Sequence, residues 1–278
     1  MKTPKQYKTV IISDVHLGSE GSKAKEVTAF LKSITCETLI MNGDIIDGWQ
    51  LKKGGSWKKK HTAFFRAVLK MIENHNTKVI YLRGNHDDFL DQIIPFQLGK
   101  YFIVQRDYIL QSGSKSYLIT HGDVFDSVTS KMKWLAYLGD IGYNFLLSIN
   151  KLYNQYRKWR GFTYYSFSQR IKQKVKDAVN YVSDFEEKLA ELAKANHCDG
   201  IICGHIHKPD IRQIKDITYM NSGDWVESLT ALVEDYQGNW DLLYLLQEST
   251  LEVEDEISDE VLDSQAFNTA KGIFMSIS

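Results

Sequence analysis

Five short polar motifs in this sequence combine carboxylate, amide and imidazole side chains, and each follows an apolar run. In chain order they are Asp14-Val15-His16, Gly43-Asp44-Ile45-Ile46-Asp47, Gly84-Asn85-His86-Asp87, His121-Gly122-Asp123 and Gly204-His205-Ile206-His207. Each motif taken singly is a weak signal, because a Gly-Asp or Gly-Asn pair commonly forms a turn. Together, however, they contain five of the eight histidines. The assembled set therefore predicts one chemical site.

The donor types indicate a metal centre. Carboxylate, amide and imidazole donors without thiolate favour Mn²⁺, with Fe and Zn²⁺ as alternatives, over Ca²⁺ or a structural zinc. Seven such side chains are too many for one ion with an open position, but they suit two ions that share a carboxylate. Two ions lower the pKa of a bridging water, which then acts as hydroxide, and they hold the attacking and leaving oxygens of a phosphoryl displacement. The predicted reaction is phosphoester hydrolysis without a protein nucleophile.

Alternating strands and helices are predicted to position the first three motifs. β-branched runs at residues 9–12, 38–41 and 78–82 alternate with helical patterns at residues 23–32 and 62–73. This order predicts a βαβ layout with a largely buried sheet. Ligand sites of open α/β sheets lie at the carboxyl ends of the strands, where these motifs fall.

The later strands follow one another more closely. After residue 100 we expect strands at residues 101–104, 108–110 and 116–120, whose short connections indicate antiparallel pairing. A second β-rich stretch runs from 200 to about 246 and includes residues 211–214, 218–221 and 240–245. The predicted fold class is α/β, with two sheets packed face to face and helices outside.

Residues 124–182 interrupt this pattern and are predicted to form a helical insertion, or lid, between the core segments 1–123 and 183–247. Apolar side chains there follow helical spacing. Ser183-Asp184-Phe185-Glu186 resembles a capping box, which predicts that a core helix begins at Ser183 and extends to about residue 195. The acidic segment 248–278 is predicted to be a mobile or loosely docked tail.

The insertion has the composition of a substrate-binding element. Residues 131–176 contain ten Lys or Arg and a single acid, and many aromatic residues lie between them. A basic and aromatic helical pair suits an anionic amphiphile or an anionic membrane surface. Packing against the core, or nucleic-acid binding, would also account for part of this composition. The predicted substrate contacts are Tyr156, Arg157, Lys158, Trp159 and Arg160.

Global properties constrain the cellular context. The 278 residues carry a net charge of −1, so overall charge does not identify a partner. A second lysine cluster at residues 52–60 surrounds Trp57; it either extends the basic surface or is a solvated loop. Three cysteines without CxxC spacing indicate reduced thiols, and Cys203 lies in an apolar run typical of a buried residue. With no membrane-spanning run or signal-peptide pattern, we expect a cytoplasmic protein, associated at most peripherally with the inner face of the membrane.

The motif series DVH, GDxxD, GNHD, HGD and GHIH resembles the calcineurin-like metallophosphoesterase superfamily over roughly residues 8–247. The resemblance implies a two-sheet sandwich with a dinuclear centre. It implies that His86 lies near the leaving group, as an acid or charge stabiliser, and that Asp87 orients its ring. It further implies that one ion is held by Asp14, His16 and His207, the other by Asn85, His121 and His205, and that both share Asp44.

Within that superfamily the sequence most resembles the UDP-2,3-diacylglucosamine pyrophosphatases (diphosphatases) of lipid A biosynthesis. The resemblance rests on DVHLG, GDIIDGW, NHDDFL and the insertion between HGD and GHIH. It implies cleavage of a UDP-linked diacyl sugar into UMP and a lipid phosphate. Two departures stand out: His86 replaces the usual Arg, and Gln50, Leu51, Lys52 and Lys53 stand where that family carries acidic residues.

Other functions fit the same motifs. A nuclease or a cyclic-nucleotide phosphodiesterase would use the same metal centre on a different substrate. A non-catalytic scaffold of the same fold is disfavoured, because decay would be expected to remove some of the seven proposed ligands.

Overall fold

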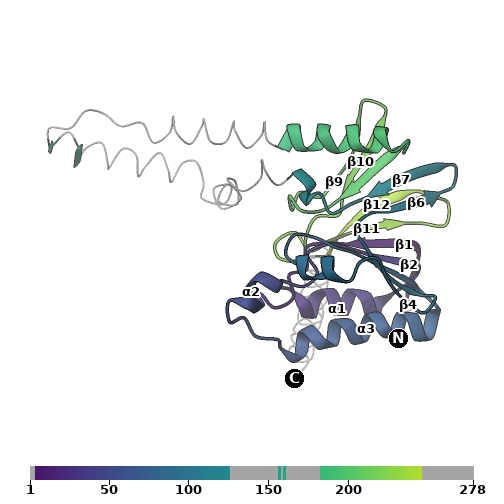
Figure 1. The fold of residues 1–278 in the computed structure, drawn as a ribbon, viewed down its shortest axis with the longest axis horizontal. Helices are drawn as coiled ribbons and strands as arrows, with labels where there is room; N and C mark the ends of the chain where they lie inside the picture. The colour runs from purple at the N-terminus through teal and green to yellow at the C-terminus, as the bar shows by residue number, and fades with distance from the viewer. Residues whose placement is uncertain (1–3, 126–155, 158, 161–181, 246–278) are drawn as a thin grey trace, which may run out of the picture.

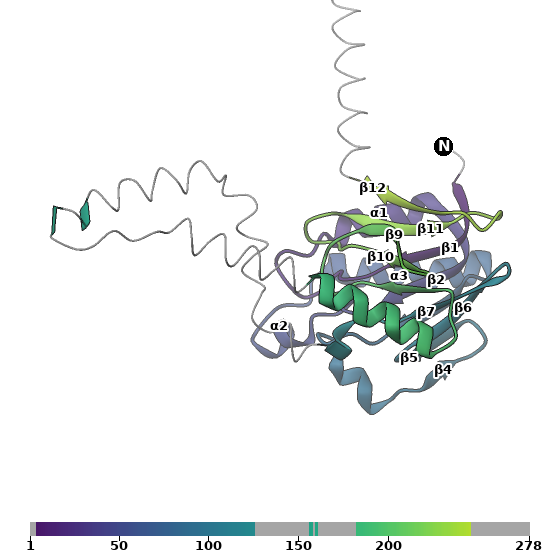
Figure 2. The ribbon, with the colours of Figure 1, turned by 90° about the horizontal axis from the view of Figure 1, so that it is seen from above.

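The computed structural model describes residues 4–125, 156–157, 159–160 and 182–245. In these parts of the chain two mixed sheets lie face to face between helices (Figure 1). Helices α1 (Ala24–Ser33) and α3 (Lys59–His75) cover the outer face of one sheet, and a helix of residues 182–195 covers the other (Figures 1 and 2). The predicted α/β sandwich is confirmed.

The first sheet has seven strands in the order β12-β11-β1-β2-β3-β5-β4. Its central strands β1, β2, β3 and β5 are parallel, whereas β4, β11 and β12 pair antiparallel with their neighbours. The strand bounds are β1 Lys5–Ile12, β2 Ile34–Asn42, β3 Lys78–Leu82, β4 Phe96–Leu98, β5 Phe102–Gln105, β11 Thr230–Glu234 and β12 Trp240–Tyr244.

The second sheet has five strands in the order β6-β7-β8-β10-β9. Strands β7, β8 and β10 are parallel, and β6 and β9 flank them antiparallel. The bounds are β6 Tyr108–Ser112, β7 Lys115–Ile119, β8 Gly200–Cys203, β9 Asp210–Ile214 and β10 Ile217–Asn221. Both sheets therefore have parallel strands at their centres.

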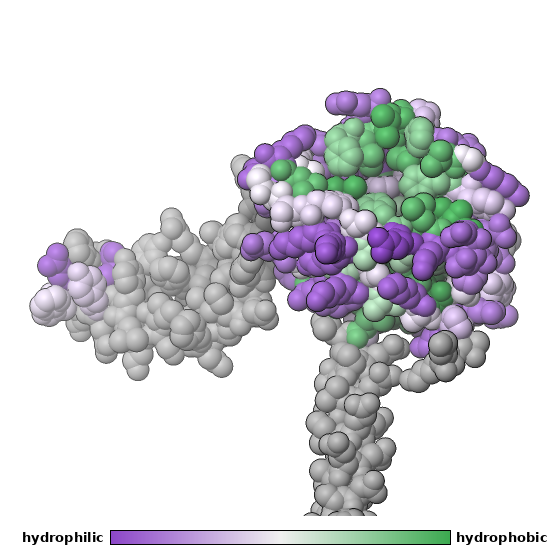
Figure 3. Space-filling model, turned by 90° about the horizontal axis from the view of Figure 1, so that it is seen from below, coloured by the Kyte–Doolittle hydropathy of each residue, from purple (hydrophilic) through white to green (hydrophobic). Residues whose placement is uncertain are grey.

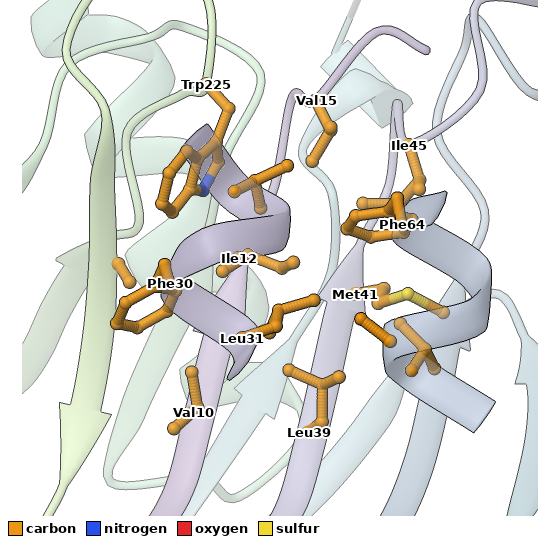
Figure 4. Packing of buried hydrophobic residues seen from close by; sticks show 14 of the residues in the cluster. Val10, Ile12, Val15, Phe30, Leu31, Leu39, Met41, Ile45, Phe64 and Trp225 are labelled. Carbon is orange, nitrogen blue, oxygen red and sulfur yellow. The ribbon is translucent and has the colours of Figure 1, made fainter. Parts of the chain in front are cut away.

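The central strands are apolar on both sides because both of their faces are buried. Leu39 and Met41 of β2 pack against α1 and α3, in the core that Figure 4 shows, whereas Ile40 between them packs against the second sheet. Successive side chains of a strand point to opposite faces, so one apolar run contributes to two cores. Trp225 closes the helix-side core against Phe30, with ring centroids 5.5 Å apart.

The helix of residues 182–195 covers the second sheet with Phe185 and Leu189, which are both buried. Its buried Glu186 forms an ion pair with Arg212 of β9. The prediction that Ser183 begins this helix is wrong, because residue 182 is already helical. Most of the predicted insertion and the acidic tail lie outside the described residues.

Several short elements differ from the prediction. Strands β4 and β11, the helix α2 (Gly48–Lys52), and the 3₁₀ turns η1 (Asp88–Gln92) and η2 (Asp123–Phe125) were not predicted. Strand β6 pairs antiparallel with β7 as expected. The expected antiparallel pairing of residues 101–104 with the next strand is wrong, because β5 belongs to the first sheet, between β3 and β4, and β6 belongs to the second.

All three cysteines are buried and free, as the sequence predicts for Cys203. Among the described residues, no helix combines the length and apolarity that spanning a bilayer requires.

Candidate metal centre

The five motifs converge at the carboxyl ends of parallel strands from both sheets. Motifs one to three follow the adjacent strands β1, β2 and β3, and the last two follow the adjacent strands β7 and β8. Because the sheets face each other, the strand ends deliver donors from two sides. Backbone bonds join the loops: Asp14 N donates to the Gly43 carbonyl at 3.1 Å, and Gly204 N donates to the His121 carbonyl at 3.1 Å.

The backbone at this edge is held in an unusual conformation. Five of the seven proposed ligands have a positive φ: Asp14, His16, Asp44, His205 and His207, with angles between 49° and 67°. Left-handed backbone is uncommon for residues other than glycine and carries conformational strain. Such strain gathers at functional sites, where surrounding structure holds it in place.

Two glycines allow the loops to approach each other. Gly43 has a φ of +79°, and a Cβ added there would collide with the ring of His121. A Cβ on Gly84 would collide with the carboxylate of Asp44. Glycine is therefore required at both positions, so that backbone can pass directly beside two proposed ligands.

Three groups of side chains have the geometry to hold a cation, with ligand atoms within 4.8 Å of one another. The first contains Asp14, His16 and His207, and another contains Asp44, His121 and His205. A third group joins His16, Asp44 and His86. Asp44 and His16 each belong to two of the groups, so the group of His16, Asp44 and His86 links the other two.

The closest contacts join each carboxylate to a histidine from the opposite sheet. Asp14 Oδ1 lies 3.2 Å from His207 Nε2, and Asp44 Oδ2 lies 3.3 Å from His121 Nε2. His16 Nε2 lies 3.9 Å from both carboxylates. Asp14 also accepts a hydrogen bond from His205 N at 3.0 Å.

The donor atoms fit divalent cations. Among the described residues, four buried atoms of the proposed ligands make no hydrogen bond: Asp14 Oδ1, His16 Nε2, Asn85 Oδ1 and His121 Nε2. Two of them, Asp14 Oδ1 and His121 Nε2, face the oppositely charged groups at 3.2 and 3.3 Å described above. A buried polar atom without a partner is costly in a folded protein, and a bound ion is one way in which that cost is relieved. Asn85 follows β3, and its free oxygen supplies the amide donor of the set.

Opposite charges perturb the ionisation of the cluster. Burial raises the pKa of Asp14 and of Asp44, but His207 beside Asp14 and His121 beside Asp44 outweigh it and lower both values. Burial lowers the pKa of His207, but the charge of Asp14 outweighs this effect and raises the pKa to about 9. The pKa of His121 is raised above its usual value by Asp44 and Asp14, against burial. The carboxylates are therefore ionised at neutral pH.

Asp47, for which the sequence indicated no role, contacts two histidines of the cluster. Its carboxylate oxygens lie 3.0 Å from His86 Nδ1 and 3.4 Å from His16 Nδ1. Burial raises the pKa of Asp47, but the bonds with His16 and His86 outweigh it and lower the value. Asp47 lies three residues after Asp44 and caps α2 through Gln50 N, and that spacing in GDIIDGW was the available signal.

Asp87 occupies a different position from the one expected. Its carboxylate is fully buried and accepts hydrogen bonds from Tyr81 Oη at 2.8 Å, Ile45 N at 3.0 Å and Gly84 N. Burial and the charge of Asp44 raise its pKa to about 6. Asp87 thus joins the second and third motif loops, and Asp47 is the carboxylate at the His86 ring.

His86 lies at the edge of the cluster. Its Nε2 is 4.0 Å from Asp44 Oδ2, and its backbone N donates to Asp44 Oδ1 at 2.7 Å. The ring of Trp49, from α2, packs against that of His86 at a centroid distance of 4.3 Å. His86, the predicted catalytic residue, therefore lies beside Asp44.

The predicted substrate contacts are not brought to this cluster. Tyr156, Arg157, Trp159 and Arg160 stand away from both sheets (Figures 1 and 2), and Lys158 lies outside the described residues. The rings of Tyr156 and Trp159 lie 6.2 Å apart, and both side chains are exposed. Their role in substrate binding stays a prediction.

Similarity to known proteins indicates the family of this chain. No match is found among curated proteins. Structurally similar chains include an archaeal phosphodiesterase, with 15% identity and a TM-score of 0.40 over 85% of this chain and 98% of that one. Vps29 from Chaetomium thermophilum gives 8% identity and a TM-score of 0.43 over 86% and 94% of the two chains. A predicted phosphoesterase from Streptococcus pneumoniae has 14% sequence identity and a TM-score of 0.36, over 86% of this chain and 90% of that one.

The family model of the calcineurin-like phosphoesterases matches residues 7–209, which is most of the chain and spans all five motifs. This match agrees with the α/β sandwich and with the Asp and His groups at its strand ends. The chain therefore belongs to the calcineurin-like phosphoesterase family.

Proposed function

We propose that this protein is a dinuclear metal-dependent phosphoesterase that hydrolyses a pyrophosphate or phosphodiester bond. The observation that supports this most strongly is the presence of three adjoining Asp and His groups, which are linked through His16 and Asp44. The buried donor atoms that make no hydrogen bond within the described residues point to the same conclusion. Such atoms support a bound cation, and the activity assays below separate catalysis from metal binding alone.

In this proposal Asp14, His16 and His207 hold one cation, and Asn85, His121 and His205 hold the other, with Asp44 shared. Mn²⁺ is the expected metal, with Fe and Zn²⁺ as alternatives, because the donors are oxygen and imidazole nitrogen without thiolate. When bound, two such cations supply positive charge that lowers the pKa of water and neutralises phosphoryl oxygens.

His86 is proposed to act on the leaving oxygen, as a general acid or as a charge stabiliser. Its Nδ1 faces Asp47 at 3.0 Å, while its Nε2 lies on the side of Asp44. A carboxylate at one ring nitrogen fixes the orientation of the ring and therefore of the other nitrogen. Trp49, packed on the ring, restricts its rotation further.

The proposed substrate is a UDP-linked diacyl sugar of the UDP-2,3-diacylglucosamine type, cleaved into UMP and a lipid phosphate. Support comes from the DVHLG, GDIIDGW and NHDDFL motifs and from the basic, aromatic segment 131–176. In this proposal, Tyr156, Arg157, Lys158, Trp159 and Arg160 contact the anionic headgroup. The reaction would then take place at the cytoplasmic face of a membrane.

The metal proposal is tested with a small aryl phosphodiester, which needs no substrate-binding element. We expect chelator to abolish turnover, Mn²⁺ to restore it, and Asp44→Ala to remove it while the protein stays folded. Asp216→Ala, which alters an exposed carboxylate far from the cluster, serves as the control and should keep full activity. Mn²⁺-dependent turnover that persists in Asp44→Ala would refute a shared carboxylate at this position.

The substrate proposal needs a separate comparison. UDP-2,3-diacylglucosamine, a cyclic nucleotide and single-stranded DNA are assayed side by side with the Mn²⁺-loaded protein. We expect the largest kcat/KM for the lipid-linked nucleotide, with UMP as a product. A larger kcat/KM for the cyclic nucleotide or for single-stranded DNA would contradict the proposed substrate but not the proposed metal centre.

A further inference from the structure

A second surface of the molecule, next to the metal centre, carries a local excess of positive charge. Residues 48–72 contain seven basic side chains and no Asp or Glu, although basic and acidic residues nearly balance in the whole chain, at 34 and 35. They are Lys52, Lys53, Lys58, Lys59, Lys60, Arg66 and Lys70, and we call this set the basic face. Six of the seven are exposed.

The basic face is built on α3 and on the loop that precedes it. Lys59, Thr62, Arg66 and Lys70 are exposed and recur at helical spacing, so they form one stripe along the helix. The opposite stripe, which includes Phe64 and Met71, is buried against the first sheet. Figure 3 views the molecule from this helix-covered side and shows a hydrophilic band with hydrophobic surface beside it.

Apart from Lys60, which donates from Nζ to the Ser22 carbonyl at 3.0 Å, these charges have no evident role, within the described residues, in holding α3. Its first turn contains lysines and no acid, although the positive end of the helix dipole lies there and disfavours cations. In the described part of the chain, Lys52 is the member of the set with an ion pair, at 3.8 Å from Asp88 between two well-exposed groups. Positive charge kept against the helix dipole and largely without acidic partners indicates an external anion.

Two exposed apolar side chains favour an anionic lipid surface over a nucleic acid as the binding partner. Trp57 is 43% exposed, yet it is held in place by stacking on Phe65 and by donating from Nε1 to Thr62 Oγ1 at 2.9 Å. Leu69, on α3, is 58% exposed. Tryptophan and leucine among lysines are the composition of a helix that lies in a membrane interface, where rings and aliphatic chains enter the headgroup region. A nucleic-acid backbone offers nothing for Leu69 to bind.

We propose that the basic face docks this protein onto an anionic lipid bilayer. The loop before α3 lies against α2 and against Gly18, two residues after His16, since a Cβ on Gly55 would meet the carbonyls of Gln50 and Gly18. Docking through this loop brings Gly18, close in sequence to the proposed ligand His16, near the membrane surface. The proposal goes beyond the proposed function and holds whichever phosphoester is cleaved.

The test is co-sedimentation of the full chain with vesicles of pure phosphatidylcholine and of phosphatidylcholine mixed with an equal part of phosphatidylglycerol. We expect binding to the anionic vesicles alone, and release by high salt. The variant Lys53→Gln/Lys59→Gln/Lys70→Gln should lose on the order of a hundredfold in partition coefficient, at roughly fivefold for each charge. Lys115→Gln/Lys194→Gln/Lys215→Gln makes the same change in net charge among exposed lysines on the side of the second sheet, and should bind like wild type.

Two further measurements separate membrane docking from nucleic-acid binding and from catalysis. Leu69→Ser should weaken vesicle binding but leave any binding to single-stranded DNA unchanged, and turnover of a soluble aryl phosphodiester should stay at the wild-type level in all these variants. Equal vesicle binding by the two triple variants overturns the proposal, as does a basic face that binds DNA but not vesicles. A failed aryl phosphodiester assay bears on the metal centre, whereas failed sedimentation bears on docking.

Discussion

Asp47 contacts Nδ1 of His86 at 3.0 Å and Nδ1 of His16 at 3.4 Å, so one carboxylate orients a proposed metal ligand and a proposed catalytic histidine. Asp47→Asn keeps the size of the side chain and an oxygen acceptor for Gln50 N, but it removes the negative charge. Loss of an outer carboxylate typically lowers metal affinity or activity about 10- to 100-fold. We expect a fall of that size in kcat on an aryl phosphodiester at saturating Mn²⁺, with a nearly unchanged melting temperature.

The nearby acid Asp88 provides the matched control. It bonds to Trp49 Nε1 at 3.4 Å and pairs with Lys52 near the same edge. Asp88→Asn therefore changes local charge equally and should keep nearly full activity. If both variants lose the same factor, the effect of Asp47 is general electrostatics and orientation of the rings is not its cause.

At this scale the sequence predicts donor types well and side-chain direction poorly. Asp14, Asp44 and the histidines of the motifs were identifiable because each polar pair follows an apolar run. Asp87 was paired with His86 because the family resemblance implied that role. In the folded loop, however, Asp87 turns inward to Tyr81 and Ile45 N. Direction depends on the φ and ψ angles of the loop, which a motif does not specify.

At the scale of elements, the loop after β2 must pass close to the ring of His121, and Gly43 makes this possible. Gly43 and Gly54 both have positive φ, at +79° and +94°, but a Cβ on Gly54 would meet open space. An alanine costs about 1–2 kcal/mol of backbone strain at either position. We expect Gly54→Ala to show that loss alone, and Gly43→Ala to lose Mn²⁺ binding as well, because its Cβ displaces His121.

Thermal unfolding of the metal-free proteins and Mn²⁺ titration of each distinguish the two effects. Normal Mn²⁺ affinity in Gly43→Ala would mean that the loop relaxes around the new methyl group. The comparison is informative because both substitutions impose a similar backbone strain.

Elements with two buried faces were the easiest to predict. Runs such as that of β2 are apolar throughout because they contribute side chains to two cores. Such an apolar run can be recognised in the sequence without knowing which strands pair. Strand β4, Phe96–Leu98, is only three residues long, lies at a sheet edge and follows a proline, so its alternation is too short to identify a strand. Strand β11 returns to pair with β1, more than two hundred residues away along the chain, and local sequence holds no record of that partner.

At the scale of the whole molecule, the candidate centre joins the two sheets. Asp14, Asp44 and Asn85 follow strands of the first sheet, whereas His121, His205 and His207 follow strands of the second. Cations bound there would hold the two layers together at one edge. Metal binding and global stability should therefore be linked, and the ionisation of the histidines determines how that linkage depends on pH.

The pKa of His207 is raised to about 9, because the charge of Asp14 outweighs burial, from the value of 6.5 expected in an unfolded chain. Between these values the metal-free folded protein keeps a proton that the unfolded chain has released, so stability falls as pH rises. The raised pKa of His121 acts in the same direction. Mn²⁺ requires neutral imidazole, so its affinity should rise over the same range. We expect the melting temperature in chelator to fall from pH 6.5 to 9, while the increment at fixed Mn²⁺ grows.

Differential scanning calorimetry of the chelated and Mn²⁺-loaded protein at several pH values measures both trends. Free Mn²⁺ at one hundred times its Kd should add about 2.7 kcal/mol. His207→Gln serves as the matched variant: it should flatten the decline seen in chelator and reduce the Mn²⁺ increment at every pH. An increment independent of pH would contradict competition between protons and metal at these histidines. If the melting temperature in chelator falls with pH while the Mn²⁺ increment rises, the same histidines of the second sheet interact with the carboxylates of the first sheet and bind the metal.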